Sequence, residues 1–141
     1  LVDLARDLEV GMLLISHDLA IVRHVAHRTA VMYLGRVVET APTIQLWSNP
    51  LHPYTRALIE AIPHADHSGQ LPVALSGEIP DPAQPPWGCR FHPRCPHVLD
   101  RCRVEDPVLS QQPGGREVAC WLHQDSAAGA PQGPFRPTTG G

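Results

Sequence analysis

The spacing of apolar residues over the first sixteen positions predicts a helix followed by a strand. A stripe at positions i, i+3, i+4 and i+7 has the period of a helix packed on a sheet; it consists of Leu1, Leu4, Ala5 and Leu8. The following run, Met12–Ile15, is too short for a helix and apolar on both faces, which favours a buried strand of a parallel sheet. We therefore expect residues 1–16 to form the second half of a βαβ crossover.

The apolar run stops at Ser16-His17-Asp18, and helical spacing resumes from Leu19 to Ala26. Ser16 and Asp18 are residue types that accept hydrogen bonds from the free N–H groups of a helix start. His17 is thus expected at the carboxyl end of a strand, the edge at which open α/β sheets bind ligands. On position alone, however, such a histidine is more often a capping or core residue than a catalytic one.

Two extended runs and two short helices are predicted next. Residues 30–34 and 37–39 flank Gly35-Arg36 and favour a strand pair or hairpin. Pro42 can open a short helix over residues 43–47, because a first-turn proline loses no helical hydrogen bond. Pro53 opens a second helix that ends at Pro63, with Tyr54 and Leu58 expected to pack on the sheet.

Composition divides the chain and excludes several functions. All 16 prolines follow Thr40, so the first 40 residues are expected to be compact α/β and the remainder loop-rich. A net charge of −3 without a basic stripe gives little support for nucleic-acid binding. The 11 basic residues are all arginine, so these residues contain no P-loop lysine. No apolar run approaches the roughly 18 residues that span a bilayer.

Four cysteines gather in one third of the chain with the spacing C-x5-C-x6-C-x17-C; they are Cys89, Cys95, Cys102 and Cys120. With no secretory signal, metal ligation is favoured over disulfides. Zinc sites usually contain a C-x2–4-C knuckle, which is missing, and widely spaced cysteines also hold iron–sulfur clusters. An iron–sulfur cluster, zinc and free thiols all stay open.

Several side chains near the cysteines are candidates for supporting roles. Any one of three histidines could replace a cysteine as a ligand; these are His92, His97 and His123. Trp87 and Trp121 flank the first and last cysteines and are expected to form a hydrophobic cover over the site.

Three segments together resemble one protein family. The stretch LLISHDLAIVRHVAHRTAVMYLGRVVE, residues 13–39, closely resembles the switch-histidine region of ATP-binding-cassette (ABC) ATPases. The stretch NPLHPYTRALIEAIP, residues 49–63, narrows the resemblance to the oligopeptide/dipeptide importer ATPases. GCRFHPRCPHVLDRC followed by VACW is similar to the cysteine-bearing extension of these ATPases. Leu75-Ser76-Gly77-Glu78 is not the LSGGQ signature, because Pro80 prevents the helix that the signature must open.

The resemblance implies an α/β fold: the C-terminal part of a P-loop NTPase (ABC ATPase) domain, followed by a small loop-rich, cysteine-containing extension. Residues 1–40 would be the ATPase remnant, 41–63 a helical connector, 64–123 the extension, and 124–141, rich in Gly, Pro, Ala, Ser and Thr, a disordered tail. His17 would contact the γ-phosphate of ATP, bound with Mg²⁺, and orient the attacking water. In some family members the extension binds a [4Fe–4S] cluster, which here would be held by the four cysteines; zinc is the alternative.

The function implied is that of an ATP-binding subunit of a peptide importer at the cytoplasmic face of the cell membrane. Its partners would be two permease subunits, a second ATPase subunit and an extracytoplasmic peptide-binding protein. The start at Leu1 resembles the middle of a domain, so these residues alone are not expected to hydrolyse ATP. Two alternatives are a metal-binding docking module without ATPase activity and a non-functional truncated fragment.

Overall fold

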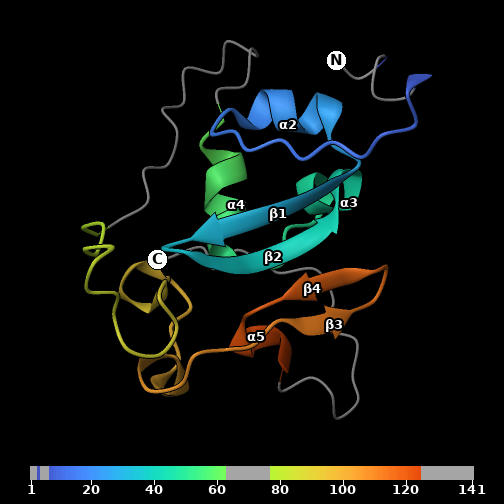
Figure 1. The fold of residues 1–141 in the computed structure, drawn as a ribbon. Helices are drawn as coiled ribbons and strands as arrows, with labels where there is room; N and C mark the ends of the chain where they lie inside the picture. The colour runs from blue at the N-terminus through green and yellow to red at the C-terminus, as the bar shows by residue number, and fades with distance from the viewer. Residues whose placement is uncertain (1–2, 4–6, 63–76, 125–141) are drawn as a thin grey trace, which may run out of the picture.

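The computed structural model describes residue 3, residues 7–62 and residues 77–124. Its regular elements, in chain order, are α2 (Leu19–Val25), β1 (Arg28–Tyr33), β2 (Arg36–Pro42), α3 (Thr43–Ser48), α4 (Pro53–Glu60), the 3-10 helices η1 (His92–Arg94) and η2 (Asp100–Arg103), β3 (Ser110–Gln112), β4 (Arg116–Val118) and α5 (Trp121–Gln124). The four strands form one sheet in the order β1-β2-β4-β3, and every neighbouring pair is antiparallel (Figure 1).

The predicted hairpin is confirmed as β1 and β2. Its turn consists of two residues, Leu34 and Gly35, with φ angles of 44° and 77°. A two-residue hairpin turn with both φ values positive matches the twist of the paired strands, and glycine adopts this conformation without strain. The register shifts between Val31 and Met32, which places a bulge in the hairpin.

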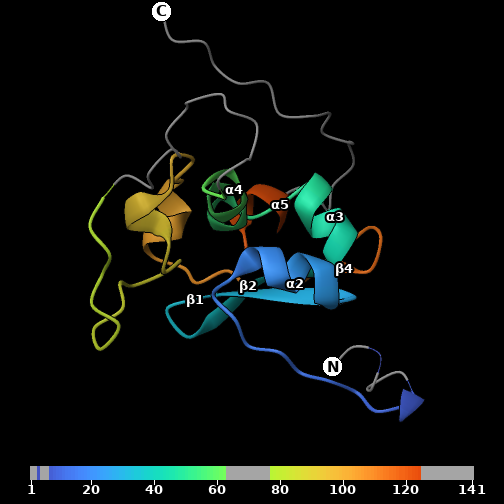
Figure 2. The ribbon, with the colours of Figure 1, turned by 90° about the horizontal axis from the view of Figure 1, so that it is seen from above.

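The predicted helices are confirmed at α2, α3 and α4. Asp18 caps α2, Pro42 precedes α3, and Pro53 occupies the first turn of α4. Seen from above, α3, α4 and α5 lie on one face of the sheet, and the chain that leads into α2 lies on the other side (Figure 2). The loop-rich residues 77–109 contact the core of this sheet and helical layer through Phe91, Cys89 and Cys95.

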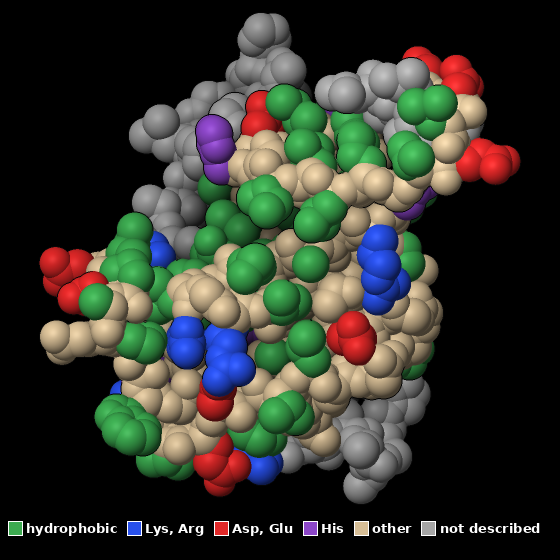
Figure 3. Space-filling model, in the orientation of Figure 1, with side chains coloured by type: hydrophobic (Ala, Val, Ile, Leu, Met, Phe, Trp, Pro, Cys, Tyr) green, Lys and Arg blue, Asp and Glu red, His purple; other side chains and the backbone are tan. Residues whose placement is uncertain are grey.

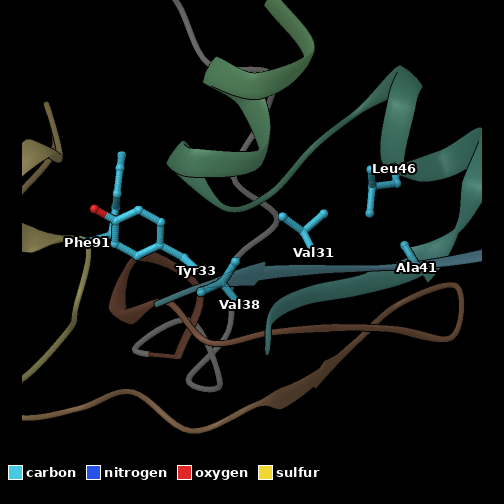
Figure 4. Close-up of a cluster of buried hydrophobic side chains, with 6 residues drawn as sticks. All are labelled: Val31, Tyr33, Val38, Ala41, Leu46 and Phe91. Carbon is cyan, nitrogen blue, oxygen red and sulfur yellow. The ribbon is translucent and has the colours of Figure 1, made fainter. Parts of the chain in front are cut away.

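The core lies between the hairpin and the helical layer. It contains six buried side chains, which are Val31, Tyr33, Val38, Ala41, Leu46 and Phe91 (Figure 4). Five come from β1, β2 and α3, whereas Phe91 comes from the loop that bears the cysteines. Tyr54 and Leu58 of α4 pack against this core as predicted. A side chain of the extension is thus part of the same core as the hairpin.

The predicted parallel strand at residues 12–15 is wrong for this structure. Residues 10–16 form no regular element, and Leu13 and Ile15 are each 90% exposed. A buried parallel strand needs neighbours that satisfy its backbone groups, and the described strands pair only with one another. The sheet that does form is antiparallel throughout. Hydrophobic side chains are scattered over the face of the molecule that is seen in the orientation of Figure 1 (Figure 3).

Other predictions fall mainly on residues outside the described part. The stripe from Leu1 to Leu8 is described only in part, as are residues 75–78. The predicted disordered tail lies outside the described residues except for Gln124. In residues 7–62 and 77–124, no helix has the length and apolar character needed to cross a membrane.

Candidate functional site

His17 lies in a bend immediately ahead of α2, with its side chain exposed. The bend is held by its two neighbours. Ser16 Oγ accepts a hydrogen bond from the Asp18 N–H at 3.0 Å, and Asp18 Oδ1 accepts from the N–H groups of Ala20 at 2.9 Å and Ile21 at 3.2 Å. The predicted helix start is therefore confirmed, with the flanking residues used for capping and the His17 imidazole exposed to solvent.

The four cysteines occupy loops and helix ends in the extension. Cys89 precedes η1, Cys95 follows it, Cys102 lies in η2 and Cys120 immediately precedes α5. Cys102 and Cys120 are buried, Cys89 and Cys95 are half-buried, and all four thiols are free. The Cys89 N–H donates to the Cys102 carbonyl at 2.9 Å, which joins the first and third cysteine segments directly.

A backbone N–H group points at each of the four sulfur atoms. Cys89 accepts from Phe91, Cys95 from His97 and Cys120 from Leu122, each two residues further along the chain. Cys102 Sγ accepts from the Leu99 N–H at 3.4 Å. Hydrogen bonds to sulfur stabilise the thiolate form, which is the form that binds metals.

The thiols also influence one another electrostatically. Burial raises the pKa of Cys120 to about 12, with smaller contributions from the other three cysteines. Burial likewise raises the pKa of Cys89 to about 11, and Cys102, Cys95 and Asp106 add to the effect. The cysteines are therefore neighbours, and the raised pKa values keep Cys89, Cys95 and Cys120 protonated and poorly nucleophilic when no cation is near.

Within the described residues, no three His, Cys, Asp or Glu side chains converge closely enough to hold a metal ion as they stand. A metal centre would therefore need the thiols to turn towards one another. Cysteine side chains can make such an adjustment by rotating about a single torsion angle. In their present positions the four cysteine side chains do not form a metal site.

The flanking residues differ in part from expectation. Trp121 is buried, donates from Nε1 to the Glu105 carbonyl at 3.1 Å, and stacks under the Arg101 guanidinium. Trp87 is 88% exposed, so the predicted cover is wrong for this residue. The reason is local: the Gly88 backbone packs against residues 102–104 and leaves the preceding indole pointing outwards.

Two of the neighbouring histidines form hydrogen bonds with backbone carbonyls. His92 Nδ1 lies 2.9 Å from the Cys89 carbonyl oxygen, and His123 Nε2 lies 3.0 Å from the Leu51 carbonyl oxygen. Because a carbonyl only accepts, each of these ring nitrogens carries the proton. In this arrangement neither nitrogen is available as a metal ligand.

A cleft of about 460 Å³ opens beside Cys89. Two of its lining residues, Arg36 and Asp106, form an ion pair of 3.6 Å between partly exposed side chains. Its lining consists of Arg36, Val37, Val38, Cys89, Arg90, Phe91, Asp106, Pro107, Val108, Leu109 and Ala119. Cys89 is the one cysteine in this lining, so it is the thiol that solvent reaches through the cleft.

Sequence reasoning missed a buried ionic contact between strands β2 and β4. Glu39 is fully buried in β2 and accepts hydrogen bonds from the backbone N–H groups of Leu51 and His52, both at 2.9 Å. Arg116 Nη2 lies 3.4 Å from Glu39 Oε1 and also donates to the Asn49 carbonyl. The only signal in the sequence is a charged residue inside an apolar strand pattern, which does not identify its partner.

His52, the first residue of the HPYT tetrapeptide (residues 52–55), is 1% exposed. Its Nδ1 accepts from the Tyr54 N–H at 3.0 Å and so caps α4. Burial, with a smaller contribution from His123, lowers the pKa of His52 to about 4, so the ring is neutral near pH 7. Its Nε2 has no hydrogen-bond partner among the described residues, so packing holds the ring.

Comparison with known proteins shows a likeness between part of this chain and a known family. A family model described as the C-terminal region of oligopeptide/dipeptide transporters matches residues 38–102. The match covers a little less than half of the chain, so the likeness to this family is carried by residues 38–102. The match contains the HPYT tetrapeptide and three of the cysteines, Cys89, Cys95 and Cys102; Arg116 and Cys120 follow it.

Similar proteins extend the likeness over most of the chain. A probable peptide ABC transporter ATP-binding protein, y4tS of Sinorhizobium fredii, is 52% identical over 91% of this chain and 36% of its own length. The di/tripeptide transport ATP-binding protein DppF of Pseudomonas aeruginosa is 48% identical over 84% of this chain and 36% of its own length. The oligopeptide transport ATP-binding protein AppD of Bacillus subtilis is 42% identical over 89% of this chain and 38% of its own length.

The resemblance predicted from the sequence is therefore confirmed. The chain spans little more than a third of the length of these curated relatives. It corresponds to the C-terminal part of ABC ATPases. Its sheet is antiparallel, and the parallel strand expected at residues 12–15 is not formed.

Proposed function

We propose that these residues belong to an ATP-binding subunit of an ABC importer for oligopeptides or dipeptides, in which ATP hydrolysis is coupled to peptide uptake. The observation that carries the proposal is the 52% identity over 91% of the chain with a peptide ABC transporter ATP-binding protein. In this proposal the subunit works at the cytoplasmic face of the membrane with two permease subunits, a second ATPase subunit and an extracytoplasmic peptide-binding protein.

His17 is proposed as the residue that contacts the γ-phosphate of ATP and orients the attacking water. Its exposed imidazole is compatible with such a contact, because the capping of α2 is performed by Asp18 instead. Phosphoryl transfer also needs a lysine and Mg²⁺ at the phosphates. The 141 residues contain no lysine, so in this proposal that group comes from outside them.

Peptide uptake by cells tests the proposed transport function. A strain lacking the gene would express either the complete gene product or its His17→Ala variant. The uptake of a labelled dipeptide and of a labelled tetrapeptide would then be measured in each strain. Uptake restored by the unmodified protein and lost in the variant supports the proposal. Uptake that is identical with and without the gene would remove peptide import from consideration.

As a second proposal, we propose that the four cysteines hold a metal centre. The preferred centre is a [4Fe–4S] cluster, and a zinc ion is the alternative. This second proposal is supported by the four neighbouring thiols and by the backbone N–H group directed at each sulfur. When bound, such a group would supply either electron transfer or a structural crosslink. The ligands would be Cys89, Cys95, Cys102 and Cys120.

Metal analysis after anaerobic purification tests this second proposal. Four iron and four sulfide per chain, with visible absorption that bleaches on reduction, indicate a cluster. One zinc per chain without sulfide indicates a zinc site. Each cysteine changed singly to serine should lower the metal content. Metal well below one site per chain would contradict both forms and leave four structural thiols.

A further inference from the structure

The cysteine-bearing extension meets the rest of the chain at the β2–β4 pairing, at the Arg36–Asp106 ion pair and at one further small region. This region, here called the socket, consists of Glu39 and residues 49–54, and therefore includes the start of the HPYT tetrapeptide. Side chains from two widely separated parts of the extension, near the first cysteine and on either side of the last, reach the socket. They are Phe91, Arg116 and His123.

Phe91 makes the apolar contact with the socket. Its side chain is 1% exposed, and its ring centroid lies 5.7 Å from that of His52 and 5.4 Å from that of Tyr54. Tyr33 of β1 closes the cluster at 5.3 Å from Phe91. Tilted and edge-on aromatic pairs at these separations contribute stability beyond the area they bury.

Arg116 and His123 make the polar contacts. Arg116 donates to the Asn49 carbonyl and pairs with Glu39, and the same carboxylate receives the N–H groups of Leu51 and His52. His123 Nε2 donates to the Leu51 carbonyl at 3.0 Å. Glu39 thus holds the socket's backbone on one side and a residue of the extension on the other.

From these contacts we propose that the HPYT segment is a docking site within the chain, which seats the cysteine-bearing extension on the β1–β2 hairpin. The burial of the segment favours this role over contact with a diffusible ligand. His52 and Thr55 are each 1% exposed, and His52 Nδ1 is already used to cap α4. The role concerns how the extension is held, and it does not depend on whether the cysteines bind metal.

Thiol protection measures the seating of the extension, because Cys102 and Cys120 are buried when it is docked. Tyr54→Ala alters the socket and Phe91→Ala alters the extension. Ile44→Ala is the matched control, since it removes a similar apolar side chain that is 85% exposed on α3. Each full chain, reduced and treated with chelator, would be alkylated with iodoacetamide and followed by mass spectrometry.

In either contact variant, alkylation of Cys102 and Cys120 should accelerate about tenfold or more, because loss of a buried aromatic ring strongly favours local opening. Amide hydrogen exchange in β1 and β2 should change less than thiol exposure does. The Tyr54→Ala/Phe91→Ala double variant should add little to the effect of either single change, since both remove one shared contact.

Three results would overturn the proposal. The first is alkylation as slow in both contact variants as in the Ile44→Ala control. The second is an equal loss of amide protection in β1 and β2, which would mean that the contact supports the whole fold. The third is fully additive effects in the double variant. If Phe91→Ala does not fold, Phe91→Leu retains most of the volume and serves in the same comparison.

Discussion

Arg116 and Glu39 form a buried ion pair, with Nη2 and Oε1 separated by 3.4 Å and the side chains 9% and 0% exposed. They are 77 residues apart in the chain, one on β4 and the other on β2. Glu39 also receives two backbone N–H groups from residues 51 and 52, so its carboxylate is satisfied from three directions. This pair links the hairpin, the HPYT segment and the extension.

Replacing Arg116 with methionine should destabilise the fold strongly. Removal of one partner leaves a buried charge uncompensated, which costs about 3–5 kcal/mol. The free energy of unfolding, measured by urea denaturation at pH 7, checks this. Arg28→Met is the matched control, because Arg28 donates to Thr40 Oγ1 at an exposed site and its loss should change stability by no more than about 0.5 kcal/mol. Equal effects of the two changes would contradict the role assigned to the buried pair.

Stability should fall as the pH drops from about 6.5 towards 4. His52 has a pKa of about 4 in the folded chain and 6.5 as its ordinary value, so the unfolded chain binds the proton first. The neutral buried ring therefore contributes stability that is fully present above pH 6.5 and is lost as pH falls to about 4, by roughly 3 kcal/mol at most.

The His52→Asn variant isolates this contribution. Asparagine retains a side-chain acceptor for the Tyr54 N–H but does not titrate. Unfolding free energies measured between pH 4 and pH 7 should depend less on pH in the variant than in the unmodified chain. An unchanged pH dependence would assign the effect to other groups.

A methyl group at Gly88 should disrupt the cysteine segment. Gly88 has a φ of 68°, and a Cβ atom there would lie 2.5 Å from the Cys102 carbonyl oxygen. Gly88→Ala should separate the two segments that the Cys89–Cys102 backbone hydrogen bond joins, and so reduce the metal content if the proposed centre forms.

Gly115→Ala provides the control for the Gly88 substitution. Its φ is 69°, and a Cβ atom there meets nothing within 4 Å. This change should cost only the backbone strain of a left-handed residue, about 1–2 kcal/mol, and leave metal content unchanged. Metal content and thermal unfolding temperature would be measured for both variants, and an equal loss in the two would contradict the close-packing argument.

Local sequence patterns predicted the local elements well. The hairpin followed from alternating apolar residues around Gly35, and α4 followed from Pro53 at its first turn. The strand at residues 12–15 was wrong because an apolar run carries no information on whether a partner strand is present in the described fold.

Contacts between distant residues were not predictable in the same way. In the sequence, Glu39 is only a charged residue that interrupts an apolar strand pattern. Its partner Arg116 is brought next to it by the fold. Trp87 was expected to cover the cysteines, but the tight approach of the following glycine turns it outwards. The roles of His17 and the four cysteines rest on the family resemblance and stay predictions.

ATP hydrolysis by the complete transporter tests the central claim most directly. The complete gene product, assembled with its permease subunits in lipid vesicles, would be compared with His17→Ala and with His24→Ala, which alters another exposed histidine nearby on α2. We predict that His17→Ala lowers the hydrolysis rate by about 100-fold or more while ATP binding is retained, and that His24→Ala leaves the rate unchanged. Hydrolysis at the full rate by the His17→Ala transporter would contradict the account.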